Sequence, residues 1–184
     1  YTPMMLQYLE VKEKYKNEIL FYRLGDFYEM FFDDAVTVSR ELELTLTGKS
    51  CGTEERAPMC GVPFHSAETY IARLVKKGYT VVVCEQMEDP ATAKGLVKRD
   101  VVRIITPGTV TESVMLTEGK NNYLCALYIS GTCAGICFAD ISTAKVYVTQ
   151  INDGDVNNRI INELATYLPS EIITNADRTG VKEI

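Results

Sequence analysis

Apolar positions at the start of the chain follow first a helical and then a strand-like pattern. Residues 4–12 carry an apolar residue every three or four positions, which predicts a helix with one apolar stripe. Thr2-Pro3 suits its start, because a threonine hydroxyl caps backbone N–H groups and proline fits the first helical position. The apolar run 19–24 predicts a buried strand. A turn near Phe27 and a second helix to about Glu43 follow. That helix is expected from apolar residues three and four positions apart: Phe31, Ala35, Val38 and Leu42.

The next part of the chain, up to Pro107-Gly108, is divided into short elements. Leu44–Thr47 alternates apolar and polar positions, as a strand does. Ser66 precedes an apolar helical pattern that ends at Lys76-Lys77, just before Gly78. β-prone runs predict two further strands, and polar or proline-containing segments connect the elements. The expected strands are 80–84 and 101–105, the loops are 48–57 and 88–95, and 58–65 is extended.

The character of the sequence changes beyond residue 110. Three alternating segments joined by short turns predict strands at 123–129, 132–140 and 145–151. Asp155 precedes a helix that Pro169 ends, and 171–174 begins another strand. The expected apolar face of the helix is Ile160, Ile161, Leu164 and Leu168. This β-β-β-α-β order is typical of the start of a ribonuclease-H-like domain.

These elements predict an α/β (α+β) chain of two domains. Residues 1–112 form a mixed-sheet domain, 113–120 a linker, and 121–184 the incomplete ribonuclease-H-like domain. The length of 184 residues suits this division. Because the chain begins with Tyr1 and stops soon after its last predicted strand, we expect it to be part of a longer protein.

Composition excludes several classes of protein. The chain is 46% hydrophobic and 24% charged, as in ordinary globular proteins. No apolar run approaches the roughly 20 residues that span a bilayer, and the first residues lack the pattern of a signal peptide. The six cysteines form no CxxC pair and no zinc-like spacing, so we expect free, mostly buried thiols in a reducing cytosol.

Charge does not indicate nucleic-acid binding by the chain as a whole. The formal net charge is −6, so any DNA-binding surface must be local. One basic cluster is present, although Asp100 dilutes it. Its members are Lys94, Lys98, Arg99 and Arg103.

Four carboxylates near the second predicted helix raise the possibility of a metal-dependent nuclease. Asp26, Glu29 and Asp33 have helix-like offsets, and two-metal nucleases use such groups. Asp34 is the fourth member. A solvated helix N-terminus, where the helix dipole favours acidic residues, is the preferred interpretation, and we expect no metal.

Two other residues invite catalytic interpretations that their surroundings do not support. Asp140 ends a strand of the ribonuclease-H-like pattern, but it lacks partner carboxylates, and a turn cap is preferred. His65 has no nucleophile motif nearby, so a structural hydrogen bond near Ser66 is expected. The chain contains neither GxxxxGK[ST] nor GxGxxG, and therefore no recognisable nucleotide site.

Phe27 and Glu29, two residues apart at the exit of a strand, are the most informative pair. Phe27 either joins Phe31 and Phe32 in the core or contacts a ligand. An apolar ring inserted between base steps unstacks and kinks a duplex, and a neighbouring carboxylate can hydrogen-bond a base. A protein-interaction module, in which Phe27 docks on a partner, is a further alternative.

Several ordered motifs resemble the MutS family of bacterial DNA mismatch repair proteins. The segment 21–31, FYRLGDFYEMF, resembles the family's mismatch-recognition motif. The likeness covers essentially all of residues 1–110 and continues more weakly beyond, with Ala139-Asp140-Ile141-Ser142 as a landmark. The other matching segments are TPMM with QYL near the start, PMCGVPFH at 58–65, CEQ at 84–86, DPATAKG at 89–95 and VVRIITPGT at 101–109.

The resemblance implies a function and its residues. Phe27 would enter the minor groove of mismatched duplex DNA and stack on a mispaired or unpaired base, and Glu29 would hydrogen-bond that base. Residues placed near the DNA backbone by this likeness are Lys49, Gln86, Lys94 and Arg99. The family often has arginine at the position of Lys49.

The same resemblance implies properties of a longer parent protein. It would be a homodimeric, DNA-dependent ATPase that uses ATP and Mg, works with a MutL-type partner and resides in the bacterial cytoplasm at the nucleoid. The chain itself would be a mismatch-recognition domain with part of a connector domain. It would be a DNA-binding module, not an enzyme, without a cofactor and without a membrane partner.

Overall fold

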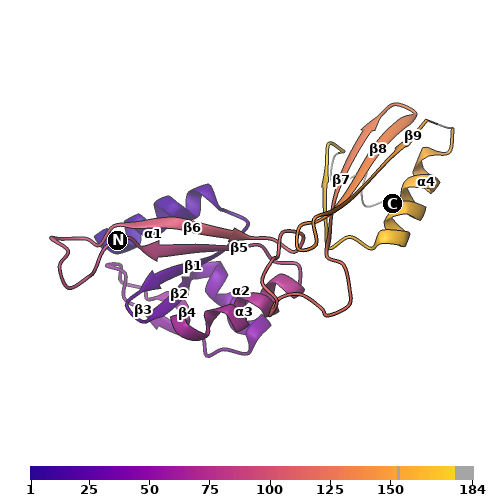
Figure 1. Ribbon diagram of the computed structural model, residues 1–184. Helices are drawn as coiled ribbons and strands as arrows, with labels where there is room; N and C mark the ends of the chain where they lie inside the picture. The colour runs from indigo at the N-terminus through magenta and orange to yellow at the C-terminus, as the bar shows by residue number, and fades with distance from the viewer. Residues whose placement is uncertain (153, 177–184) are drawn as a thin grey trace. The chain divides into compact units, whose positions relative to one another are not determined.

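The computed structural model describes residues 1–152 and 154–176 (Figure 1). Contacts between residues divide the chain into two compact units, Tyr1–Ile105 and Thr106–Ile184. Both units combine helices with a mixed sheet, which confirms the predicted α/β class. The predicted domain limits at 112 and 121 remain predictions. Within the described residues, no helix has both the length and the apolar character needed to cross a membrane.

The first unit is built on a six-stranded sheet of order β3-β4-β2-β1-β5-β6. Strands β1 and β5 are parallel, and the other neighbouring pairs are antiparallel. The elements in chain order are α1 (Pro3–Lys14), β1 (Ile19–Leu24), β2 (Phe27–Phe31), α2 (Phe32–Leu42), β3 (Thr47–Lys49), β4 (Ala57–Pro63), the 3-10 turn η1 (Phe64–Ser66), α3 (Ala67–Lys76), β5 (Val81–Gln86) and β6 (Arg99–Ile105).

Both faces of this sheet are covered by helices. On one face Met5 and Tyr8 of α1 pack against Leu20, Tyr22 and neighbouring side chains. Helices α2 and α3 contact strands of the sheet and each other, and the Cys60 thiol lies 3.5 Å from a carbonyl of α2 on that opposite face. Coverage from both sides explains why the central strands are apolar runs and not alternating ones.

The sequence prediction was wrong for two local elements. A turn leading into a helix was expected at Phe27–Phe31, but these residues form strand β2. They do so because β1 and β4 supply hydrogen-bonding partners on both sides. Leu44–Thr47 is not a strand; β3 begins only at Thr47. The cause of the second error is the C-cap of α2, where Glu43 adopts a positive φ and Leu44 N–H returns to Ser39 O at 2.9 Å.

The second unit contains a four-stranded sheet of order β10-β7-β8-β9. Its elements, in chain order, are β7 (Tyr123–Ser130), β8 (Cys133–Asp140), β9 (Lys145–Ile151), α4 (Val156–Tyr167) and β10 (Glu171–Thr174). The predicted β-β-β-α-β order is therefore confirmed. Ile160 of α4 is buried in the core of this unit, but Ile161 and Leu168 are exposed and do not belong to the expected apolar face. Leu168 is the C-cap residue, in the left-handed region, and lies past the last helical turn.

Two further predictions concern a turn in the second unit and the thiols of both units. Asp140 caps the turn after β8, as expected: its Oδ1 accepts hydrogen bonds from Ser142 N, Ser142 Oγ and Thr143 N. All six cysteines are free thiols; four are buried, and Cys133 and Cys137 are half-buried.

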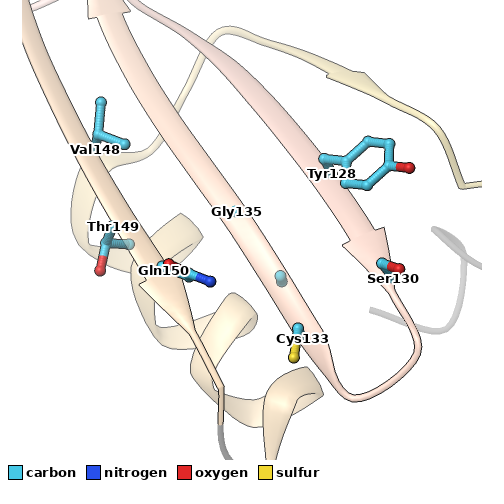
Figure 2. A pocket seen from close by; sticks show the side chains of 8 residues that line it. Tyr128, Ser130, Cys133, Gly135, Val148, Thr149 and Gln150 are labelled. Atoms are coloured by element: carbon cyan, nitrogen blue, oxygen red, sulfur yellow. The ribbon is translucent and has the colours of Figure 1, made fainter.

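A shallow pocket of about 390 Å³ lies on the sheet of the second unit (Figure 2). Tyr128, Cys133 and Val148 are among the residues that line it, together with small and uncharged polar residues. Among the described residues, no carboxylate, imidazole, amine or guanidinium lines this pocket, so it lacks the groups that most acid–base catalysis uses.

Candidate nucleic-acid interface

A tight hairpin between β1 and β2 positions Phe27. Leu24 pairs with Phe27, so Gly25 and Asp26 form a two-residue turn. Gly25 has φ +59°, the conformation that glycine adopts at the first central position of a hairpin turn. The N–H of Phe64 donates to Asp26 O at 2.9 Å and ties this turn to η1.

Alternation along β2 sends its side chains to opposite faces of the sheet. Tyr28 and Met30 are buried on the face covered by α2 and α3. Phe27, Glu29 and Phe31 point to the other face. There Phe31 lies under Tyr8 of α1, with ring centroids 4.9 Å apart, whereas Phe27 is 46% exposed. Phe27 therefore does not join Phe31 in the core.

Gly61 of β4 lies beside this pair of side chains. It stands opposite Glu29 in the ladder. A Cβ at this position would lie 3.2 Å from Tyr28 O, 3.5 Å from Glu29 Cγ and 3.8 Å from Phe27 Cδ1. Only the 3.2 Å approach to Tyr28 O is tight, whereas the distances to the Glu29 and Phe27 side chains are ordinary van der Waals contacts.

Glu29 forms an ion pair with Lys49 of β3. The Lys49 ammonium lies 2.5 Å from Glu29 Oε2, and the two side chains are 33% and 15% exposed. Lys49 Nζ also lies 5.7 Å from the centre of the Phe31 ring. The structure thus joins two residues that the sequence placed in separate roles, one at the base and one at the DNA backbone.

Arg99 belongs to an internal network that ties β6 to β1 and α1. Its Nε donates to Arg23 O at 2.8 Å, and its Nη1 donates to Gln7 Oε1 at 2.9 Å and to Val97 O at 3.1 Å. Tyr22 donates its hydroxyl hydrogen to the same Gln7 oxygen at 2.7 Å. Burial raises the pKa of Tyr22 to about 12, so this hydroxyl stays protonated at neutral pH. Arg99 therefore supports the base of the β5–β6 loop.

The other two predicted backbone contacts lie in or beside that loop. Gln86 is the last residue of β5 and pairs with Arg99 in the ladder. Lys94 is exposed within the loop that connects β5 and β6. The hydrogen bond from Met87 N to Lys98 O, 2.9 Å long, closes the base of this loop.

Side chains on the back of the hairpin stiffen it, and sequence reasoning missed them. The Arg23 guanidinium lies 3.8 Å from the centre of the Phe64 ring and forms an ion pair with Glu85 at 3.5 Å. The Tyr28 hydroxyl donates to the same Glu85 carboxylate. His65 packs edge-on against Phe64. Only the strand pairing shows these contacts, because Arg23 and Glu85 are 62 residues apart in the sequence.

The carboxylates of the nuclease alternative do not converge. Because β2 is extended, Asp26, Glu29 and Asp33 do not share a helix face. Asp34 is buried and accepts hydrogen bonds from Leu20 N at 3.0 Å and Lys12 Nζ at 2.9 Å. Throughout residues 1–152 and 154–176, no three His, Cys, Asp or Glu side chains are placed to hold a metal ion together. The geometry gives the nuclease alternative no support.

Fold and site together define a class of protein: a two-unit α/β protein whose first sheet presents one exposed aromatic ring beside an ion-paired carboxylate. Comparison with known protein families identifies the family to which the chain belongs. Residues 2–114 match the family model of MutS domain I, and residues 122–182 match that of MutS domain II. The chain belongs to the MutS family.

Curated relatives are similar along the whole chain. The DNA mismatch repair protein MutS of Ruminiclostridium cellulolyticum is 61% identical over 183 residues, which is 100% of this chain and 21% of the relative. The protein of the same name from Acetivibrio thermocellus is 62% identical over 176 residues, 96% of this chain and 20% of the relative. The chain thus spans about a fifth of the length of these relatives.

Proposed function

We propose that this chain recognises mispaired or unpaired bases in duplex DNA and thereby initiates DNA mismatch repair. Its relatives carry the name of a DNA mismatch repair protein. The observation that carries the proposal is the placement of Phe27, 46% exposed at the end of a hairpin whose other aromatic residues are buried.

Phe27 acts as a wedge from the minor groove. Its backbone is held by strand partners on both sides, Leu24 and Pro63, so the ring is presented from a rigid sheet. A ring that stacks on a base recovers about 1–3 kcal/mol, which offsets part of the cost of unstacking and kinking the duplex. A mispaired base is cheaper to displace than a paired one, so the wedge responds to weak pairing and not to sequence.

Glu29 lies two residues along the same face of β2 and hydrogen-bonds the displaced base. The backbone of the DNA is contacted by Lys94 and Gln86, at and beside the β5–β6 loop. Arg99 holds the base of that loop through its hydrogen bonds to Gln7 and to the backbone. Its role is therefore to support the loop, whereas the family likeness implies a direct contact with the DNA backbone.

Properties of the longer protein follow from the family and complete the proposal. It works as a homodimer, binds ATP with Mg in a part outside this chain, recruits a MutL-type partner and acts in the bacterial cytoplasm at the nucleoid. The chain itself is the DNA-binding module and performs no reaction.

The test is Phe27→Ala in the full-length protein. Loss of stacking worth about 1–3 kcal/mol lowers the preference for a mismatched over a matched duplex by about 5-fold to 150-fold. Fluorescence anisotropy titrations with both duplexes measure it. Tyr128→Ala, which removes another exposed ring, serves as the control and keeps the preference. If Phe27→Ala discriminates as well as the unmodified protein does, the wedge is wrong, and docking of Phe27 on a protein partner becomes the better explanation.

A further inference from the structure

The ion pair between Lys49 and Glu29 gives Lys49 a role that a backbone contact does not explain. The two residues are on β3 and β2, and β4 runs between these strands. Lys49 reaches across it and ends 2.5 Å from one carboxylate oxygen, Glu29 Oε2. In the described residues, the other oxygen, Oε1, has no hydrogen-bond partner.

Burial makes this contact stronger than a typical surface ion pair. The Glu29 side chain is 15% exposed and that of Lys49 is 33% exposed, so water screens the pair only partly. Lys49 Nζ is the group that holds the carboxylate, at Oε2.

We propose that Lys49 is a positioning residue that orients Glu29 for base recognition. Lys49 occupies Oε2 and leaves Oε1 as the one acceptor that faces the base, so a displaced base is recognised by an N–H donor in a fixed place. Lys49 also offsets the repulsion between the Glu29 carboxylate and the DNA phosphates. This inference rests on the proposed function, because it assigns Lys49 to the base-reading carboxylate.

Two roles for Lys49 make different predictions. A lysine that only neutralises a phosphate strengthens binding to matched and mismatched DNA alike, and its removal lowers the salt dependence of binding. A lysine that positions Glu29 contributes to discrimination, and its effect disappears when Glu29 is absent. Residues whose side chains are in contact show such non-additive effects, whereas independent ones do not.

A double-mutant cycle in the full-length protein separates them. The variants are Lys49→Met, Glu29→Ala and their combination, titrated with a G·T mismatch and the matched duplex at two salt concentrations. We expect Lys49→Met to lower the preference for the mismatch about threefold to tenfold, as coupling between contacting charges allows. In the Glu29→Ala background the same substitution leaves the remaining preference unchanged. Lys49→Arg keeps the charge, and we expect this variant to retain most of the preference for the mismatch.

Lys94→Met is the matched control, because Lys94 is an exposed lysine of the same unit and forms no pair with Glu29. This substitution is expected to weaken binding to the matched and the mismatched duplex equally. If Lys49→Met also weakens binding to the two duplexes equally, and by the same factor with and without Glu29, the positioning role is overturned. That outcome is distinct from failure of the proposed function, in which Phe27→Ala itself keeps full discrimination. Thermal unfolding of each variant confirms that it is folded.

Discussion

At the scale of single residues, the exposure of Phe27 and the burial of Phe31 have one cause. Both point to the same face of β2, but α1 packs over Phe31 and leaves Phe27 uncovered. Neither ring differs in chemistry from the other, so residue type alone left both alternatives open. Glu29 and Lys49 show the same dependence, since their pairing follows from the position of β4 between their strands.

Asp34 illustrates how a buried carboxylate stabilises the first unit. Desolvation raises its pKa, while hydrogen bonds from Leu20 N and Lys12 act in the opposite direction. Asp34→Ala leaves the Lys12 ammonium and the Leu20 N–H without this acceptor, and we expect it to lower the free energy of unfolding by about 3 kcal/mol. Urea denaturation measures the change.

Asp33→Ala is the control for that variant, because Asp33 is the adjacent aspartate and is exposed. A surface substitution of this kind changes stability by no more than about 0.5 kcal/mol. Equal losses in the two variants would mean that the hydrogen bonds of Asp34 contribute little.

At the scale of elements, the hairpin β1–β2 was the least predictable part of the first unit. The segment Phe27-Tyr28-Glu29-Met30-Phe31 has apolar residues at almost every position, and periodicity cannot separate a short buried strand from a helix in such a run. What decides is β4, 26 or more residues further along the chain, whose backbone pairs with the whole of β2. The two elements that flank β2 in the chain, β1 and α2, were predicted nearly correctly because their patterns are longer.

The turn of this hairpin depends on the backbone of Gly25. Its φ is +59°, and a Cβ there would meet nothing within 4 Å, so any cost of a side chain comes from backbone strain alone. We expect Gly25→Ala to destabilise the chain by about 1 kcal/mol and Gly25→Asn by less, because asparagine tolerates the left-handed region better. Chemical denaturation compares them.

Gly135→Ala in β8 provides the comparison for strain. A Cβ at Gly135 also meets nothing within 4 Å, but this glycine does not have a positive φ. It is therefore expected to cause no strain penalty. A cost for Gly135→Ala as large as that for Gly25→Ala would contradict the assignment of strain to the turn.

At the scale of the whole molecule, the division into two compact units predicts separable stability. Asp140 lies in the second unit, where it accepts hydrogen bonds from Ser142, Thr143 and Asn122. Asparagine keeps one oxygen acceptor, but its NH2 group cannot accept the hydrogen bond that Asn122 N donates to Oδ2, and the lost charge also weakens the bonds that remain; together this costs about 2 kcal/mol. We therefore expect Asp140→Asn to speed amide hydrogen exchange in β7, β8 and β9 and to leave β1 and β5 unchanged. Faster exchange in both units to the same extent would show that they unfold together.

The stability of the second unit is expected to depend on pH through Asp140. Burial alone would raise the pKa of Asp140, but hydrogen bonds from Ser142, Asn122 and Thr143 together lower it. A carboxyl whose pKa is lower in the folded state stabilises the protein above its unfolded pKa of about 4. This contribution is lost as pH falls through the folded pKa. Because asparagine does not titrate, Asp140→Asn shows a smaller loss of stability on acidification than the unmodified chain.

The sequence by itself determined the α/β class, the order of most elements and the motif that carries Phe27 and Glu29. It did so because periodic apolar patterns, caps and ordered motifs are local properties of the chain. Only the tertiary structure decided that Phe27 is exposed, that Glu29 pairs with Lys49, and that Arg99 is bound to Gln7. Each of these facts arises between strands or helices that are distant in sequence, and a side chain's exposure and partners depend on what the fold places beside it.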